Sequence, residues 1–156
     1  MYHPRMIRVV FAEDNYLVRE GTAALLATSD QVELVGTATT HDELLAAVEE
    51  HAPDAVLTDI RMPPTGTNEG IEAAKTIRAA HPEIGVVVLS QFVEEDYAFD
   101  LLKDGAAGLG YLLKERVAAA GALTDALERR LCQGECVVDP SIVSRVMSRR
   151  AGGWEV

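Results

Sequence analysis

The chain has 156 residues and a formal net charge of −11, with 14 Lys and Arg against 25 Asp and Glu. That length suits one ordinary domain with a short addition and is too small for two full domains. So large an excess of negative charge repels nucleic-acid phosphates and anionic lipids, which argues against DNA or a membrane surface as the partner.

The chain shows no sign of export or membrane insertion. Its first residues, MYHPRMIRVV, lack the long apolar core of a signal peptide. No apolar run approaches the ~20 residues that a membrane span requires. The two cysteines, Cys132 and Cys136, are too few for a disulfide framework and lack a second ligand pair for zinc. We therefore expect a cytoplasmic protein with reduced thiols.

Short apolar runs rich in β-branched residues alternate with segments of helical spacing. The five runs are Ile7–Phe11, Val32–Gly36, Ala55–Leu57, Ile84–Leu89 and Gly108–Leu113. Nearly continuous runs of this length are typical of strands covered on both faces. The helical segments are Tyr16–Ala27, Asp42–Glu50, Ile71–Ala80, Glu94–Lys103 and Arg116–Leu131, and a capping box begins at Thr40. The alternation predicts a (βα)5 doubly wound parallel sheet, flavodoxin-like, with strand order 2-1-3-4-5.

A further segment follows this pattern. After the short run Cys136–Val138, Asp139 and Pro140 suit the N-cap and first turn of a last helix that reaches about Arg150. Its apolar stripe consists of Ile142, Val143, Val146 and Met147. The stripe either packs on its own domain or belongs to a linker or dimer helix. We predict a domain over residues 1–133 and a linker helix with a flexible end over 134–156.

Polar residues follow the apolar runs at the carboxyl ends of the predicted strands. They are Glu13 and Asp14 after the first strand, Asp59 after the third, Ser90 after the fourth and Lys114 after the fifth. In doubly wound sheets ligands bind at this edge, where the winding reverses between strands 1 and 3. The three carboxylates should therefore converge.

Converging carboxylates repel one another, so such a site normally holds a proton or a cation. Hard oxygen ligands suit Mg²⁺ or Ca²⁺, and we favour Mg²⁺ because it keeps positions open for phosphate oxygens. Lys114 can neutralise a phosphate and the Ser90 hydroxyl can donate to it. Asp59, alone on its strand end, suits the nucleophile of an aspartyl-phosphate reaction.

In order, the motifs AED, TDIRMP, LSQ and GYLLKE resemble those of the receiver domain of two-component response regulators, from about Ile7 to Leu131. The resemblance implies the following roles: phospho-acceptor, Asp59; Mg²⁺ ligands, Glu13, Asp14, Asp59 and the backbone carbonyl of Arg61; switch hydroxyl, Ser90; phosphate-sensing lysine, Lys114; switch aromatic, Tyr111. The segment GECVVDPSIVSRVMSRR resembles the linker to LuxR/NarL-type helix-turn-helix output domains, and we expect that output domain to be absent from this chain.

The resemblance implies a bacterial regulator that takes a phosphoryl group from a sensor histidine kinase and then changes its conformation and dimerisation to control transcription. It is not a conventional enzyme, since it catalyses only its own phosphorylation and dephosphorylation. DNA binding is not expected, because the basic residues of the last helix, Arg145, Arg149 and Arg150, are too few for the usual phosphate contacts.

Two alternatives belong to other classes. A degenerate receiver would serve as a phosphorylation-independent interaction module, but the intact set of five polar residues argues against it. A metal-dependent phosphatase or a flavoprotein would need a second acid or base, or a cofactor loop, and neither motif is found. The chain also departs from the receiver pattern, because the loop RMPPTGTNEG reaches Gly70 about three residues late.

Overall fold

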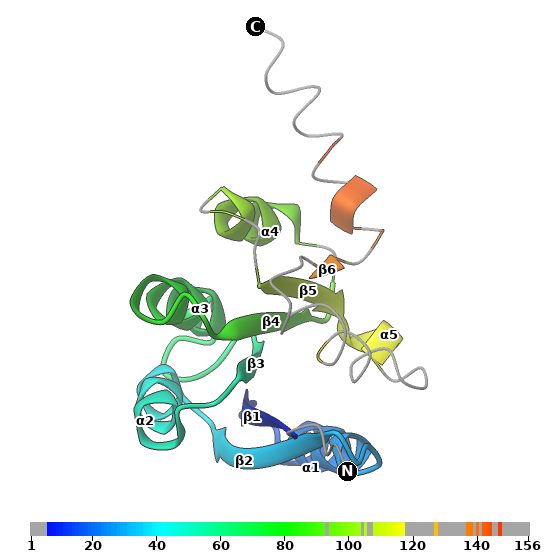
Figure 1. The fold of residues 1–156 in the computed structure, drawn as a ribbon. Helices are drawn as coiled ribbons and strands as arrows, with labels where there is room; N and C mark the ends of the chain where they lie inside the picture. Colours follow the sequence, from blue (N-terminus) through cyan, green and yellow to red (C-terminus); the bar gives the residue numbers. More distant parts are fainter. Residues whose placement is uncertain are drawn as a thin grey trace, which may run out of the picture.

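A parallel β-sheet forms the centre of the fold (Figure 1). The computed structural model describes residues 6–92, 94–103, 105, 108–117, 127, 137–138, 140, 142–144 and 147. Its strands are β1 (Ile7–Ala12), β2 (Val32–Ala38), β3 (Ala55–Asp59), β4 (Gly85–Ser90), β5 (Leu109–Leu113) and β6 (Val137–Val138). All adjacent strands pair in parallel, in the order β2-β1-β3-β4-β5-β6. The predicted flavodoxin-like order of the first five strands is confirmed.

Helices cover both faces of the sheet. They are α1 (Tyr16–Leu26), α2 (His41–His51), α3 (Glu69–Ala80), α4 (Glu95–Leu102) and α5 (Lys114–Val117). Figure 1 shows α2, α3 and α4 on one side of the sheet, with α1 and α5 on the other. Because successive strand residues point to opposite faces, β1 supplies Val10 to the core under α2–α4 and Phe11 to the core under α1.

The predicted helix starts depend on short polar side chains, and the structure shows how they work. Thr40 caps α2, because its hydroxyl oxygen accepts from the Glu43 amide at 3.1 Å. The Glu43 carboxylate reaches back one residue further than a capping box requires and accepts from the Thr39 amide at 2.9 Å. Asn15, which the sequence did not single out, caps α1 by accepting from the Val18 amide at 3.0 Å.

The residues after the fifth strand add to the sheet and to the core. The short run at Val137–Val138, predicted only as an apolar segment, is strand β6 at the edge of the sheet. Ile142 is fully buried in the core on the α4 side, whereas Val143 and Met147 are exposed. Most of the predicted helix over 116–131 lies outside the described residues, as do Cys132, Cys136, Asp139, Arg145, Val146, Arg149, Arg150 and the expected flexible end.

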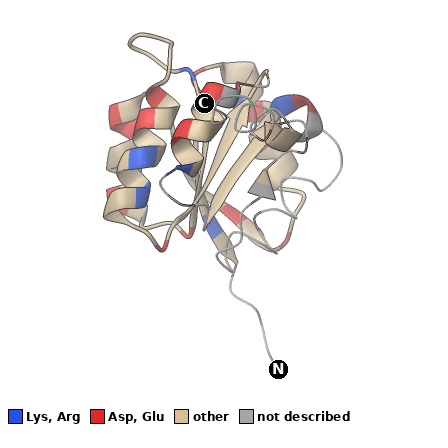
Figure 2. Ribbon diagram, turned by 90° about the horizontal axis from the view of Figure 1, so that it is seen from above, with Lys and Arg blue, Asp and Glu red and all other residues tan. Residues whose placement is uncertain are grey.

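Acidic residues are spread over the part of the surface that the structure describes, in keeping with the net charge of −11. Figure 2 shows acidic residues on several of the helices that surround the sheet. Among the described residues, no helix is long and apolar enough to cross a bilayer.

Candidate functional site

The structure brings the predicted polar residues to one edge of the sheet. Asp59 and Ser90 are the last residues of β3 and β4, and Lys114 follows the last residue of β5. Glu13 and Asp14 follow β1, which pairs directly with β3. The parallel register thus places all five positions at carboxyl ends of strands, as the sequence predicted.

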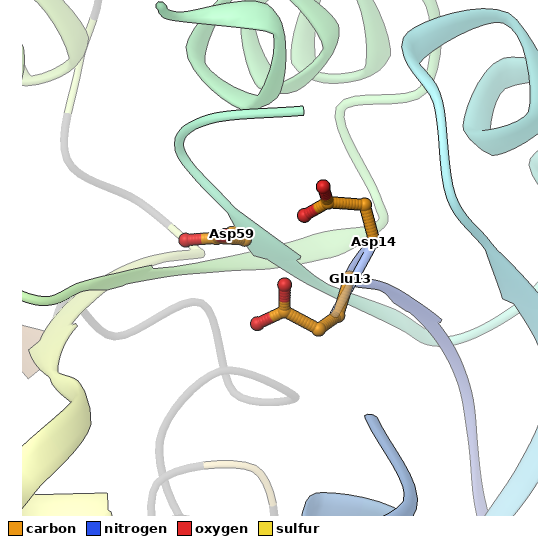
Figure 3. Close-up of side chains that lie close together, drawn as sticks. All are labelled: Glu13, Asp14 and Asp59. Atoms are coloured by element: carbon orange, nitrogen blue, oxygen red, sulfur yellow. The ribbon is translucent and has the colours of Figure 1, made fainter. Parts of the chain in front are cut away.

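Three of these residues form an acidic cluster. One carboxylate oxygen from each of Glu13, Asp14 and Asp59 lies within 4.8 Å of the others. Figure 3 shows Glu13 and Asp14 extending from the end of β1 toward the side on which Asp59 lies at the end of β3. Glu13 is buried, Asp59 is partly buried and Asp14 is exposed. A graded exposure of this kind leaves one side of the cluster open to a ligand from solvent.

Lys114 joins two of the three acids. Its ammonium lies 3.0 Å from Glu13 Oε1 and 3.1 Å from Asp59 Oδ1. Desolvation lowers the pKa of Lys114, but the nearby carboxylates of Asp59 and Glu13 outweigh it and hold that pKa above its ordinary value. Lys114 therefore stays charged at neutral pH. With all three acids ionised, one ammonium leaves two negative charges in excess at the cluster.

Backbone groups fix the two acids that Lys114 contacts. The Asn15 amide donates to Glu13 Oε2 at 3.2 Å, so each of the two carboxylate oxygens of Glu13 has a partner. The Ile60 amide donates to Asp59 Oδ1 at 2.9 Å. The contacts of Asp59 with Ile60 and Lys114 both fall on Oδ1. The carboxylate is thus oriented through one oxygen.

Gly70 lets helix α3 begin against the end of β3. A Cβ atom at this position would lie 1.7 Å from the backbone oxygen of Asp59. The Gly70 amide also donates to the Ile60 carbonyl at 2.8 Å. Only glycine permits so close a backbone approach, so the position of Asp59 depends on Gly70.

The long loop between Asp59 and Gly70 is organised by Glu69. The Glu69 carboxylate is buried and accepts from the amides of Thr65 at 2.7 Å and Thr67 at 3.1 Å, and also from the Thr65 hydroxyl. The Thr65 hydroxyl is the largest of the contacts that lower the pKa of Glu69 to about 2. The stretch from Thr65 to Glu69 is therefore an ordered turn, whose conformation the sequence could not predict.

Ser90 and Glu94 form a second polar group beside the cluster. The Ser90 hydroxyl is fully buried and makes hydrogen bonds to the Phe92 carbonyl and, at 3.0 Å, to Glu94 Oε2. Arg61 donates to both carboxylate oxygens of Glu94 through its two terminal nitrogens. Desolvation raises the pKa of Glu94, but the hydrogen bonds from Arg61 and Ser90 outweigh it and keep that pKa below its ordinary value.

Tyr111 lies on β5 next to this group. Its ring is fully buried, and its hydroxyl donates to the Glu94 carbonyl at 3.4 Å. Burial raises the pKa of Tyr111 well above its ordinary value, so the hydroxyl keeps its proton. In this conformation the Tyr111 ring already lies inside the protein. A movement of Tyr111 on phosphorylation would therefore start from the buried position.

Sequence reasoning missed Glu94 and the side chain of Arg61. Glu94 is the first of three consecutive acids, Glu94 to Asp96, which is the ordinary pattern of a helix start. Its position four residues after Ser90 was the only available signal. Which of the three acids turns back to the sheet depends on the loop conformation.

The donor set at the acidic cluster fits a hard divalent cation. Carboxylate oxygens are preferred ligands of Mg²⁺ and Ca²⁺, and the cluster carries excess negative charge beside Lys114. Arg61, whose carbonyl is the fourth predicted ligand, lies two residues after Asp59 at the start of the ordered loop. The cluster therefore has the composition of an acidic metal pocket.

Comparisons with known proteins agree with the geometry. A family model described as "Response regulator receiver domain" matches residues 9–128. The chain is 32% identical over 142 residues to the oxygen regulatory protein NreC of Staphylococcus epidermidis, which covers 91% of this chain and 62% of NreC. The chain therefore spans less than two thirds of that relative's length.

Solved structures show the same relationship. A LuxR-family two-component response regulator from Aurantimonas sp. SI85-9A1 superimposes with a TM-score of 0.79 at 25% identity, covering 94% of this chain and 99% of that one. The receiver domain of the putative response regulator NarL from Mycobacterium tuberculosis gives a TM-score of 0.68 at 32% identity, covering 81% and 100%. Receiver domains are signalling modules rather than classical enzymes, and they bind Mg²⁺ at an acidic pocket. The chain belongs to the response regulator receiver family, and its homologues are NarL/LuxR-type regulators.

Proposed function

We propose that this chain accepts a phosphoryl group on Asp59 from a sensor histidine kinase, in a Mg²⁺-dependent reaction in the cytoplasm. The observation that carries the proposal is the contact of Lys114 with both Glu13 and Asp59 inside a three-carboxylate cluster. An acidic nucleophile, a cation pocket and a fixed ammonium are the parts that phosphoryl transfer needs.

Asp59 supplies the nucleophile. Because Ile60 and Lys114 both engage Oδ1, we assign Oδ2 as the attacking oxygen. A bond forms between Oδ2 and phosphorus while the bond from phosphorus to the imidazole nitrogen of the donor breaks, and the imidazole keeps the electron pair. Lys114 is close enough to Oδ1 to balance charge on the transferring group.

Glu13, Asp14, Asp59 and the Arg61 carbonyl would hold the Mg²⁺ ion. When bound, the ion supplies positive charge to the phosphoryl oxygens. Asp14 is the most exposed of the three acids, so it is the ligand that a hydrated ion reaches first. Water later hydrolyses the acyl phosphate, which resets the protein.

The phosphorylated form signals through the β4–β5 side of the sheet. Phosphorylation adds charge and strong acceptor oxygens at Asp59, and Ser90 and Lys114 are the nearby donors that can respond. Tyr111 follows through its contact with the Glu94 carbonyl. We propose that this change favours a homodimer, whose formation can be followed by sedimentation of the chain with and without beryllofluoride.

Output would run through a separate domain joined by residues 134–156. Several relatives are named transcriptional regulatory proteins, which supports control of transcription. Strand β6 and the buried Ile142 fasten the start of this linker to the domain of residues 1–133. DNA contact belongs to the output domain in this proposal.

Intact mass measurement with acetyl phosphate tests the central step. With Mg²⁺ the chain should gain the mass of one phosphoryl group, and the gain should be lost in Asp59→Ala and without the metal ion. Asn68→Ala, on the nearby loop but outside the proposed site, should still be modified. An unmodified wild-type chain would favour the degenerate receiver, a phosphorylation-independent interaction module.

A further inference from the structure

Glu94 connects three parts of the site that are distant in sequence. Its carboxylate accepts from Arg61, which follows β3, and makes a hydrogen bond with Ser90, which ends β4. Its backbone carbonyl accepts from Tyr111 on β5. One residue therefore contacts the loop that carries a proposed metal ligand and both of the proposed switch residues.

The hydroxyl proton of Ser90 is already in use. A serine hydroxyl has a single proton to donate, and in this structure the acceptors around Ser90 are Glu94 Oε2 and the Phe92 carbonyl. A phosphoryl group on Asp59 needs the same proton. Ser90 can donate to that group only after its hydrogen bonds with the Phe92 carbonyl and with Glu94 are both given up, and the Glu94 carboxylate is the charged one of these two acceptors.

Arg61 holds Glu94 in the competing position. Its two terminal nitrogens reach the two carboxylate oxygens, a planar arrangement that fixes orientation as well as distance. The Glu94 side chain is only 16% exposed, so water competes weakly for it, whereas Arg61 is 45% exposed. The Arg61 side chain also lies over the Tyr97 ring, 5.9 Å from its centre.

We propose that Glu94 is a positioning residue that competes with the phosphoryl group on Asp59 for the Ser90 hydroxyl, and thereby sets how readily the site takes up that group. The proposal rests on the proposed function of Asp59. Phosphorylation would displace Glu94 in two ways, by offering Ser90 a more highly charged acceptor and by repelling the Glu94 carboxylate. Arg61 is then released together with Glu94.

Beryllofluoride binding measures the competition without a kinase. In the presence of Mg²⁺, Glu94→Ala should bind beryllofluoride about tenfold more tightly than the wild-type chain, because one charge-assisted hydrogen bond no longer has to be broken. Glu94→Gln keeps an acceptor for Ser90 without the charge and should lie between the two. Glu33→Gln removes an equal charge from an exposed position on β2 and should match the wild type.

A double-mutant cycle separates competition for Ser90 from a general electrostatic effect. In a Ser90→Ala background, Glu94→Ala should change beryllofluoride affinity by less than about twofold, because the shared proton is gone. A tenfold effect that survives in this background would overturn the proposal. It would mean that Glu94 acts through its charge or by restraining Arg61.

Amide chemical shifts give a readout that loosened structure alone would not produce. In ligand-free Glu94→Ala, the Ser90 and Tyr111 signals should move toward their positions in the beryllofluoride-bound wild type. Equal affinities of wild type and Glu94→Ala, with unmoved signals, would sink this inference and leave the proposed function standing. A wild-type chain that takes up neither beryllofluoride nor a phosphoryl group would remove the proposed function, and the inference with it.

Discussion

Glu69 and Glu94 each hold a loop beside Asp59, but they do so with different kinds of partner. Glu69 accepts from the Thr65 and Thr67 amides and from the Thr65 hydroxyl, all within four residues of itself. Glu94 binds the side chains of Arg61, 33 residues away, and of Ser90. The first set is local and mostly backbone, whereas the second joins separate elements through side chains.

This difference indicates which loop is scaffold and which can change. The contacts of Glu69 all lie within its own loop and do not involve Asp59, so we expect the loop after β3 to keep its shape through the reaction. The Ser90 hydroxyl, which makes a hydrogen bond with Glu94, would find a new acceptor in a phosphoryl group on Asp59. The loop after β4 should therefore rearrange while the loop after β3 stays in place.

The largest effect is expected where the scaffold loop meets β3. Gly70→Ala places a Cβ atom 1.7 Å from the Asp59 backbone oxygen, and relief requires α3 or the end of β3 to move. Overpacking of this severity should lower the free energy of unfolding by ~3 kcal/mol or more. Urea denaturation measures it. Gly21→Ala in α1 meets no atom within 4 Å and should instead stabilise the chain by up to ~1 kcal/mol. Equal stabilities for the two variants would mean that α3 and the end of β3 accommodate a side chain at position 70 without cost.

The second-largest effect on stability is expected from Mg²⁺ binding. The ion should bind without changing the shape of the loop after β3. At about tenfold over its dissociation constant the ion should add ~1.4 kcal/mol of stability, which raises the melting temperature by roughly 3 to 5 °C for a chain of this size. Asp14→Ala should remove the increment and also relieve repulsion in the ion-free cluster. Asp42→Ala, at an exposed position on α2, should keep the full increment. An unchanged response in Asp14→Ala would place the ion elsewhere.

The fold was predictable because its signals are local. Runs such as that of β4, buried at every position, are apolar along their whole length, and the polar residue that ends each run marks the sheet edge where ligands bind. The pattern therefore located Asp59, Ser90 and Lys114 correctly at strand ends. Strand β6 was missed as a strand because two residues carry too little periodicity to distinguish it from a loop.

The details of the site were not predictable for the opposite reason. Whether Lys114 contacts Glu13 as well as Asp59 depends on side-chain geometry across three strands. From the sequence, Glu69 was part of the loop RMPPTGTNEG, and Glu94 was one acid among three. A sequence pattern identifies which residues lie at the carboxyl edge of the sheet. It does not identify which side chains they contact there.

A smaller effect, the pH dependence of the unfolding free energy, tests the role of Glu69 in the loop after β3. Hydrogen bonds, first that from the Thr65 hydroxyl, lower the pKa of Glu69 from its ordinary 4.5 to about 2. A carboxyl whose pKa is depressed by folding contributes stability above its unfolded value, and that contribution is lost as the pH falls through the folded value. The difference in unfolding free energy between wild type and Glu69→Gln should therefore be constant above pH 4.5 and shrink between pH 4.5 and 2. Paired urea titrations of the wild type and Glu69→Gln measure this difference, and a difference that stayed constant down to pH 2 would contradict the role given to Glu69.

The smallest effect on stability, and the sharpest test of the contrast, is expected from Arg61→Met. Methionine keeps an apolar side chain near Tyr97 but removes the pair with Glu94. Because the Arg61 side chain is 45% exposed, water and salt screen the pair, and the loss should be under ~1 kcal/mol. Freed from Arg61, the Glu94 carboxylate should hold the Ser90 hydroxyl less firmly, so amide hydrogen exchange should quicken in the loop after β4. The amides of Thr65 and Thr67, held by Glu69, should exchange at the wild-type rate. If both loops loosened together, they would form a single cooperative unit, and the division between a fixed scaffold and an exchangeable loop would be wrong.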